Sequence, residues 1–206
     1  APRRTMSPAH VLEPTYRRLK NALLEGRFPV GAKLEAMRLA DDFGVSMTPV
    51  RDSLNQLVGE GLVDFTPGEG FRVPLLTEQA LRDILQINAL LLEQAPDNDR
   101  TSRDIDEGSN DTRGAYADRL ADAFRGIAAN SGNRFRVHLV ERINDRLHTL
   151  RKLEPELWPA ASQSLEQIER TVRQGSDEQT RAIRAYHRHI QDLVPALVGR
   201  LNQQTG

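Results

Sequence analysis

Apolar residues in the first part of the chain recur at helical intervals. The first such stretch includes Tyr16, Leu19 and Leu23. It predicts a helix over about 13–26, with Pro14 in the first turn, where a missing N–H is tolerated. A second, short helix is expected over 36–43, and Gly44 follows it as a typical helix-ending residue.

A third helix is expected to begin at Ser46, whose hydroxyl suits an N-cap, with Pro49 inside the first turn. One face of this helix is apolar and consists of Val50, Leu54 and Leu57. The opposite face consists of Met47, Thr48, Arg51, Asp52 and Asn55. Such a helix buries its apolar side and leaves the other side in solvent.

The run LVDFTPGEGFRVPLL changes from helical to alternating spacing. Val63 and Phe65 alternate with polar residues, as do Phe71 and Val73, and the PGEG segment between them is typical of a turn. This pattern predicts a β-hairpin with a glycine-rich tip. Helix, short helix, turn, helix and hairpin, in that order, predict a winged helix-turn-helix, and we assign residues 1–75 to it.

The chain after Pro74 is predicted to be helical, so the fold class is mainly α, with an all-α bundle over 76–206. The helical patterns cover about 77–94, 114–131, 133–153, 160–174 and 176–203. The first is so apolar toward its end that burial on more than one side is expected. Residues 95–113 have almost no large apolar groups and predict a loop or a partly disordered connection. Pro195 predicts a kink or a stop near position 194.

Composition restricts the chemistry of the chain. Its 206 residues are 28% charged, with a formal net charge of −1 and no cysteine. The lack of cysteine excludes disulfides, thiolate metal sites and a cysteine nucleophile, and it fits a reducing cytoplasm. Because there is no overall basic charge, a DNA-binding surface would need locally placed cations. The first ten residues lack the apolar core of a signal peptide, and no apolar run approaches the roughly 20 residues of a membrane span.

Candidate DNA contacts gather around the third helix. A helix in the major groove presents the side chains of its first turns to bases and its N–H groups to phosphate. The candidates lie before the turn, on that helix or on the hairpin: Lys33, Arg38, Ser46, Met47, Thr48, Pro49, Arg51, Asn55, Gly68, Gly70 and Arg72. Each also has an ordinary interpretation. Ser46 would cap any helix, the glycines suit any hairpin, and Arg51 beside Asp52 suits any solvated face.

The ordered set resembles the winged-helix domain of the GntR family of bacterial transcription regulators. The matching segments are LLEGRFPVGAKL, LADDFGVS, TPVRDSLNQLVGEGLV and TPGEGFRV, within residues 11–75. The resemblance implies DNA binding as a homodimer on a palindromic or near-palindromic operator, usually as a repressor.

Two positions depart from that family's pattern. The family commonly has arginine where this chain has Met37 and Met47. Methionine cannot form the bidentate guanine contact of arginine, which contributes on the order of 1–3 kcal/mol of discrimination, but it can contact a thymine methyl or fill space. We therefore expect altered operator preference rather than loss of DNA binding, with Arg51, Thr48 and Arg38 as the polar contacts.

The helical part resembles the FCD effector domain of the FadR-like subfamily. This resemblance implies a bundle that holds a small carboxylic acid or similar metabolite and forms most of the dimer interface. Many members also use an aspartate and three histidines to bind a divalent metal. Here Arg125 and Leu165 replace two of those histidines, so we expect no metal or other cofactor.

The candidate effector contacts are Arg125, Asp122, Asp118 and His189. Arg125 could bind a carboxylate directly, or it could instead pair with one of the two aspartates. His187 and His189 lie two residues apart and point in different directions on a helix, so surface or hydrogen-bonded roles are the simpler interpretation.

The leading interpretation is therefore a cytoplasmic, dimeric, DNA-binding regulator controlled by a metabolite. An enzyme is disfavoured because the chain has no phosphate-binding glycine loop, HExxH motif, nucleophile elbow or cysteine. A third possibility is a protein-interaction or sensor module that has kept the winged helix but lost specific DNA binding.

Overall fold

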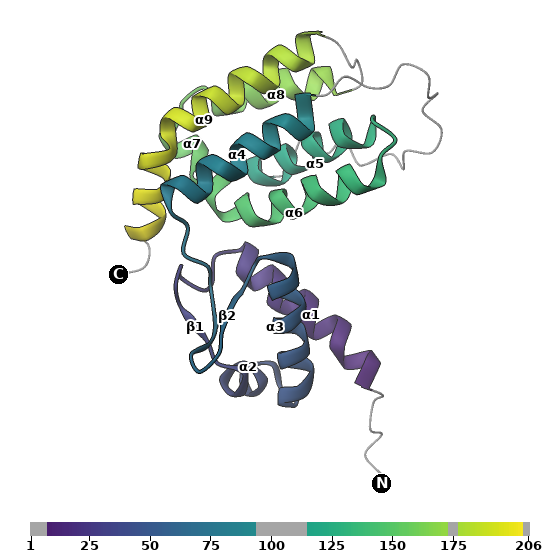
Figure 1. Ribbon diagram of the computed structural model, residues 1–206, viewed down its shortest axis with the longest axis vertical. Coiled ribbons are helices and arrows are strands. Elements are labelled where there is room, and N and C mark those ends of the chain that lie inside the picture. The colour runs from purple at the N-terminus through teal and green to yellow at the C-terminus, as the bar shows by residue number, and fades with distance from the viewer. Residues whose placement is uncertain (1–7, 94–114, 173–176, 204–206) are drawn as a thin grey trace. The chain divides into compact units, whose positions relative to one another are not determined.

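The computed structural model describes residues 8–93, 115–172 and 177–203, with side chains from residue 11 onward. The chain divides between Leu75 and Leu76 into two compact units, which are described separately below. Figure 1 shows the elements of both. None of the helices in the described ranges is long and apolar enough to span a bilayer.

The N-terminal unit contains helices and a small sheet. Its elements are α1 (Pro8–Leu24), β1 (Lys33–Leu34), α2 (Ala36–Phe43), α3 (Met47–Glu60), β2 (Asp64–Thr66) and β3 (Gly70–Arg72). The sheet is antiparallel with the order β1-β3-β2, and Phe65 of β2 pairs with Phe71 of β3. The hairpin is thus confirmed, whereas β1 was not predicted, because two residues are too few to show an alternating pattern.

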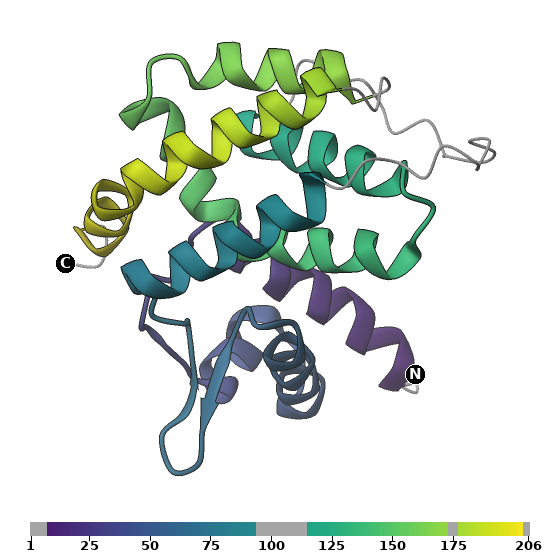
Figure 2. The same cartoon turned by 45° about the horizontal axis from the view of Figure 1, so that its top comes forward.

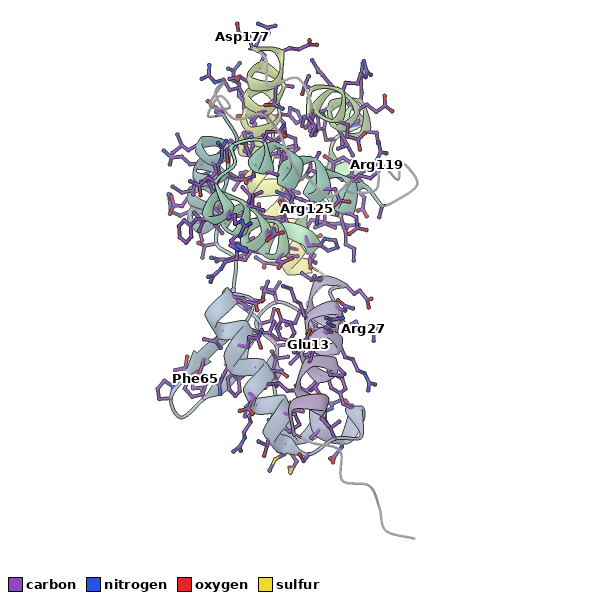
Figure 3. The ribbon with its side chains drawn as sticks, turned by 90° about the vertical axis from the view of Figure 1, so that its right-hand side faces the viewer. Glu13, Arg27, Phe65, Arg119, Arg125 and Asp177 are labelled. Atoms are coloured by element: carbon purple, nitrogen blue, oxygen red, sulfur yellow. The ribbon has the colours of Figure 1, made fainter. Side chains whose placement is uncertain are left out.

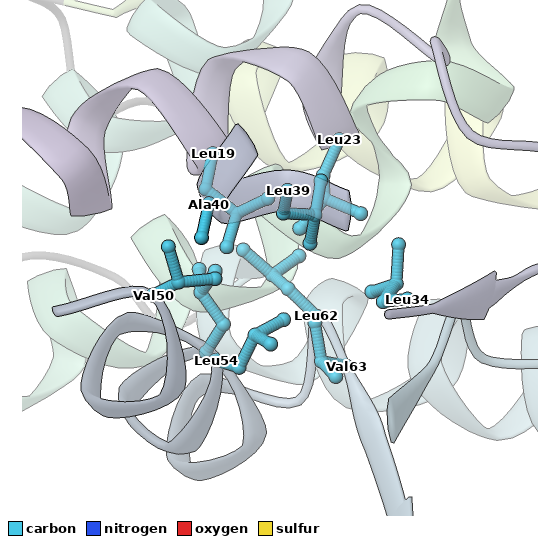
Figure 4. Packing of buried hydrophobic residues seen from close by; sticks show 10 residues of the cluster. Leu19, Leu23, Leu34, Leu39, Ala40, Val50, Leu54, Leu62 and Val63 are labelled. Atoms are coloured by element: carbon cyan, nitrogen blue, oxygen red, sulfur yellow. The ribbon is translucent and has the colours of Figure 1, made fainter. Parts of the chain in front are cut away.

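A single apolar core holds α1, α2 and α3 together. Leu19 from α1 and Leu54 and Leu57 from α3 have no exposed surface, and Leu39 of α2 is 4% exposed. Figure 4 shows these helices converging on the cluster. The predicted apolar face of α3 is therefore confirmed.

The ends of two of these helices are set by glycine, but the start of α1 differs from the prediction. Gly44 after α2 and Gly61 after α3 have φ of 67° and 76°, and their N–H groups bond to carbonyls of the preceding turn. The helix α1 begins at Pro8 rather than near residue 13, so Pro14 lies inside it. The prediction was wrong because Pro14 was taken to mark the first turn, whereas the helix begins earlier and contains this proline in its interior.

The C-terminal unit is entirely helical over its described residues. It contains α4 (Glu78–Glu93), α5 (Tyr116–Ala129), α6 (Arg134–Arg151), α7 (Glu154–Leu157), α8 (Ala161–Thr171) and α9 (Asp177–Gln203). Figure 2 shows α4 beside α9 and α5 beside α6, and these are the most extensive helix contacts of the unit. The mainly α fold class is confirmed.

The predictions for this unit had different outcomes, and one lies outside the described residues. Of the kink or stop predicted near position 194, the stop is excluded, because α9 continues through Pro195 to Gln203. The expected burial of α4 on more than one side was wrong, because its buried residues share one face and Ile87 and Leu90 on another face are 52% and 57% exposed. The expected loop over 95–113 falls outside the described ranges.

Candidate nucleic-acid interface

The first turn of α3 is open toward solvent. Ser46 occupies the N-cap position with extended backbone, yet its side chain makes no capping hydrogen bond. Pro49 lies in the first turn, and its carbonyl accepts a 2.7 Å bond from the buried Ser53 hydroxyl. The Ser46 hydroxyl and the N–H groups of the first turn therefore remain suited to phosphate.

The solvent face of α3 contains the residues expected there. Met47, Thr48, Arg51, Asp52 and Asn55 are all exposed. Within the described ranges Arg51 forms no ion pair, including none with its neighbour Asp52. A guanidinium in this state can bind a base edge or phosphate without first breaking a protein contact.

The other candidate cations differ in how firmly they are held. Arg38 of α2 is exposed, and no ion pair involves it among the described residues. Lys33 lies 3.6 Å from the Glu35 carboxylate. Arg72 lies 3.7 Å from Glu69 and donates a 3.4 Å hydrogen bond to the Gly31 carbonyl. These pairs are exposed and weak, so Lys33 and Arg72 lose little when they move to phosphate.

The hairpin tip requires glycine for its backbone. Gly68 and Gly70 have φ of 86° and 89°, and an added Cβ would meet no atom within 4 Å at either position. Glycine is therefore needed for the left-handed conformation rather than for space. Phe65 projects from the hairpin (Figure 3), is 50% exposed and contacts Phe71 with a ring separation of 4.9 Å.

Two positioning contacts in this unit could not be read from sequence. Arg18 of α1 donates to the Asp42 and Phe43 carbonyls at 3.3 Å each, and its guanidinium lies 4.2 Å from the Phe43 ring. It thereby satisfies free carbonyls at the end of α2, next to the turn. Glu60, the last residue of α3, accepts a 2.6 Å bond from the Tyr16 hydroxyl and so fixes α3 against α1.

The four candidate effector contacts form three separate interactions. Arg125 donates to Asp122 at 2.8 Å on an exposed surface of α5. Asp118 lies 3.8 Å from Nδ1 of His148, and His189 packs on Trp158 with ring centres 4.2 Å apart. Of the two interpretations of Arg125, the structure shows the aspartate pair. Among the described residues, no group of three or more histidine, aspartate or glutamate side chains could hold a metal.

The buried polar groups of this unit lie elsewhere, around Phe124. Arg151, Glu154, Asn88 and His187 are each at most 4% exposed. Burial raises the pKa of Glu154 to about 7, although Arg151 and the hydroxyls of two tyrosines act against that shift. Burial lowers the pKa of His187 to about 4. No candidate of the sequence analysis belonged to this cluster.

The fold and the exposed face of α3 define a winged helix-turn-helix domain. Residues 13–73 match the family described as "Bacterial regulatory proteins, gntR family". The N-terminal unit therefore matches the GntR family in sequence, in agreement with the resemblance.

Curated relatives give the same class. The chain is 28% identical over 156 residues to "Uncharacterized HTH-type transcriptional regulator YdhC" of Bacillus subtilis, covering 67% of this chain and 68% of that protein. It is 38% identical over 74 residues to "HTH-type transcriptional repressor GlaR" of Escherichia coli, covering 36% of this chain but 34% of that protein. The names of these relatives support the class of DNA-binding transcription regulators, rather than enzymes, for this chain.

Solved structures extend the likeness in fold to nearly the whole chain. The structure of E. coli McbR/YncC matches with a TM-score of 0.53 and 18% identity, covering 95% of this chain and 99% of that one. A putative GntR regulator from Rhodococcus sp. RHA1 matches with a TM-score of 0.60 and 14% identity, covering 91% and 97%. At these identities the likeness concerns the fold alone.

Proposed function

We propose that the chain represses transcription by binding a palindromic or near-palindromic operator as a homodimer, under the control of a small carboxylic acid or similar metabolite bound in the C-terminal unit. It acts in the cytoplasm, where its DNA lies. The main supporting observation is the exposed polar face of α3, on which Arg51 has no ion-pair partner among the described residues.

In this proposal α3 lies in the major groove. Thr48, Arg51 and Asn55 contact base edges, while the Ser46 hydroxyl and the first N–H groups of α3 bind phosphate. Met47 is 42% exposed on the same face and offers an apolar surface for thymine methyls in place of a guanine contact. Arg38 and Lys33 bind the phosphate backbone, and Arg72 follows the hairpin toward the minor groove.

The proposed dimer would use the exposed apolar strip at the end of α4. Ile87 and Leu90 lie three residues apart, so they share one helix face, and each is more than half exposed. A second copy would bury this surface and present two α3 helices to two half-sites. The metabolite would act by binding more tightly to one arrangement of the two DNA-binding units than to the other.

Selection of bound sequences from a random DNA pool tests this function. We expect a consensus with two inverted half-sites, and a binding constant that falls linearly on a log–log plot as salt rises, because phosphate contacts release counterions. Arg51→Ala should reduce the enrichment. Arg27→Ala removes an exposed arginine that is paired with Glu25 beyond α1, and it serves as the matched control.

The competing function is a protein-interaction or sensor module without specific DNA binding. Exposed methionines at positions 37 and 47 favour it, because the family commonly has arginine there. Failure to enrich any sequence at low salt, from a protein that is folded by circular dichroism, would establish this alternative and overturn the regulator proposal.

A further inference from the structure

Arg151 is a buried cation whose hydrogen-bonding capacity is only partly used. It ends α6, is 1% exposed, and donates through Nη1 to Oδ1 of Asn144 at 2.7 Å. Its guanidinium lies 5.0 Å from the Phe124 ring centre. Its Nε and Nη2 are buried and have no hydrogen-bond partner in the part of the chain that the structure describes. Unpaired buried donors on a charged group are strongly unfavourable, so their presence suggests a ligand.

The two unpaired nitrogens belong to one edge of the Arg151 guanidinium. Nε–H and Nη2–H lie on the same edge of the planar guanidinium and point in parallel, which is the arrangement that binds both oxygens of a carboxylate. Nη1 lies outside this edge and is the atom already used by Asn144. The free edge therefore matches a planar, two-oxygen anion.

The nearby Glu154 does not occupy this edge. Its carboxylate, 1% exposed, instead accepts a 2.7 Å hydrogen bond from Tyr116 and bonds of 2.9 and 3.1 Å from Tyr186. No ion pair joins Glu154 to Arg151 among the described residues. The tyrosine hydroxyls therefore bind the Glu154 carboxylate, while Nε and Nη2 of Arg151 have no acceptor among the described residues.

A second unpaired atom is linked to the same aromatic ring through His187. His187 stacks on Phe124 at 5.8 Å, and Asn88 Nδ2 lies 3.1 Å from His187 Nε2. His187 Nδ1 lies 2.9 Å from the Ile183 carbonyl, so it must be the protonated nitrogen, and Nε2 accepts from Asn88. This network orients Asn88, and its buried Oδ1 has no donor among the residues of the described ranges.

We propose that Arg151 is the anion receptor of the C-terminal unit, and that its Nε/Nη2 edge binds the carboxylate of a small organic acid within the helical bundle. The proposal rests on the proposed control by a metabolite and moves the binding residue from Arg125 to Arg151. Asn88 Oδ1 favours an acid that also has a hydroxyl group, because this oxygen can accept the hydroxyl hydrogen.

Thermal unfolding in the presence of acetate tests the receptor, with chloride at equal ionic strength as the reference. We expect saturating acetate to raise the Tm of the unchanged protein by about 2–4 °C. The same rise is expected in Arg125→Gln, the matched control on the surface of α5. Arg151→Met should show no rise. A rise that persists in Arg151→Met, or no rise in the unchanged protein, would overturn the proposal.

Two further variants keep the test independent of folding. Arg151→Lys retains the charge but loses the planar edge, so acetate should not raise its Tm either. Glycolate should raise the Tm of the unchanged protein more than acetate does, and this preference should disappear in Asn88→Leu. Equal effects of glycolate and acetate would contradict the role of Asn88. A larger rise with inorganic phosphate, dependent on Arg151, would overturn the carboxylate as ligand class.

Operator binding separates this inference from the proposed function. Without added acid, the unchanged protein should bind the selected operator, because the proposed DNA contacts all lie in the N-terminal unit. If the unchanged protein binds no operator, the proposed function fails. If operator binding is intact but acetate has no effect on Tm, only the receptor assignment fails.

Discussion

The two units of the chain place the arginines that we propose to bind ligands in opposite environments. In the N-terminal unit, Arg51 and Arg38 are exposed and have no ion-pair partner among the described residues. In the C-terminal unit, Arg151 is 1% exposed and lies against Phe124. An exposed cation suits a large polyanion that approaches from solvent, whereas a buried cation suits a small ligand that the bundle encloses.

The largest effect expected concerns the core of the N-terminal unit. Leu54→Ala removes a fully buried side chain shared by α1 and α3, and should lower the free energy of unfolding of that unit by about 2–5 kcal/mol. Met37→Ala, at a position 67% exposed, is the control and should change it by less than about 0.5 kcal/mol. Thermal melts followed by circular dichroism measure both. If operator binding survived in a Leu54→Ala protein with a melted N-terminal unit, binding would not depend on that unit.

The buried groups of the C-terminal unit predict two opposing dependences of stability on pH. The pKa of Glu154 is raised from 4.5 to about 7, so the folded state holds its proton more tightly and stability falls as pH rises across that range. The pKa of His187 is lowered from 6.5 to about 4, so stability rises with pH between those values. Each effect is on the order of 3 kcal/mol, and the two largely cancel where they overlap.

Single substitutions should separate the two dependences. In Glu154→Gln only the dependence due to His187 should remain, so stability should rise from pH about 4 to about 6.5. His187→Gln should leave the Glu154 effect, so stability should fall from pH about 4.5 to about 7. Urea unfolding at several pH values gives the slopes, which do not depend on the overall loss of stability. Parallel slopes in the two variants would show that neither group is held in the described state.

Arg51→Ala tests the exposed cation of the N-terminal unit. Loss of one base or phosphate contact should weaken operator binding by about 1–3 kcal/mol, or roughly tenfold to a hundredfold. Fluorescence anisotropy with the selected operator measures the change, and Arg27→Ala should leave affinity unaltered. An Arg51→Ala protein with unchanged affinity would remove this residue from the interface.

The smallest change in affinity is expected at position 47, where a substitution should instead change the preferred base. Met47→Arg adds the guanidinium that the GntR family commonly has, and should shift the preferred base toward guanine by roughly 1–3 kcal/mol of discrimination. Repeating the random-pool selection with the variant measures this shift. If both affinity and base preference stayed the same, Met47 would not contact DNA.

The N-terminal unit could be predicted largely from sequence because its signals are local. The positions of α2 and α3 follow from Gly44, Ser46 and the spacing of Leu54 and Leu57. The two-residue strand β1 was missed because it forms only by pairing with β3, whose register no local pattern encodes. The contact of Arg18 with the end of α2, 25 residues later in sequence, was missed for the same reason.

The effector contacts chosen from the sequence of the C-terminal unit stay predictions. Arg125 and Asp122 were chosen by their place in a family pattern, but they pair with each other on the surface of α5. Nothing in the sequence distinguishes Arg151 from the other arginines of α6. Its burial depends on α5 and α9 supplying Phe124, Tyr186 and His187 around it.

The sequence alone determined the order of helices and hairpin, the winged helix-turn-helix and the exposed face of α3, because helical period, caps and turn residues act over a few positions. The tertiary structure decided which polar groups are buried and which hydrogen bonds they lack. Tyr116 and Tyr186 donate to Glu154 across separations of 38 and 32 residues, and Nε and Nη2 of Arg151 have no hydrogen-bond partner within the described ranges. Such partners are brought together only by packing, because the energy of a buried charge depends on every group that surrounds it.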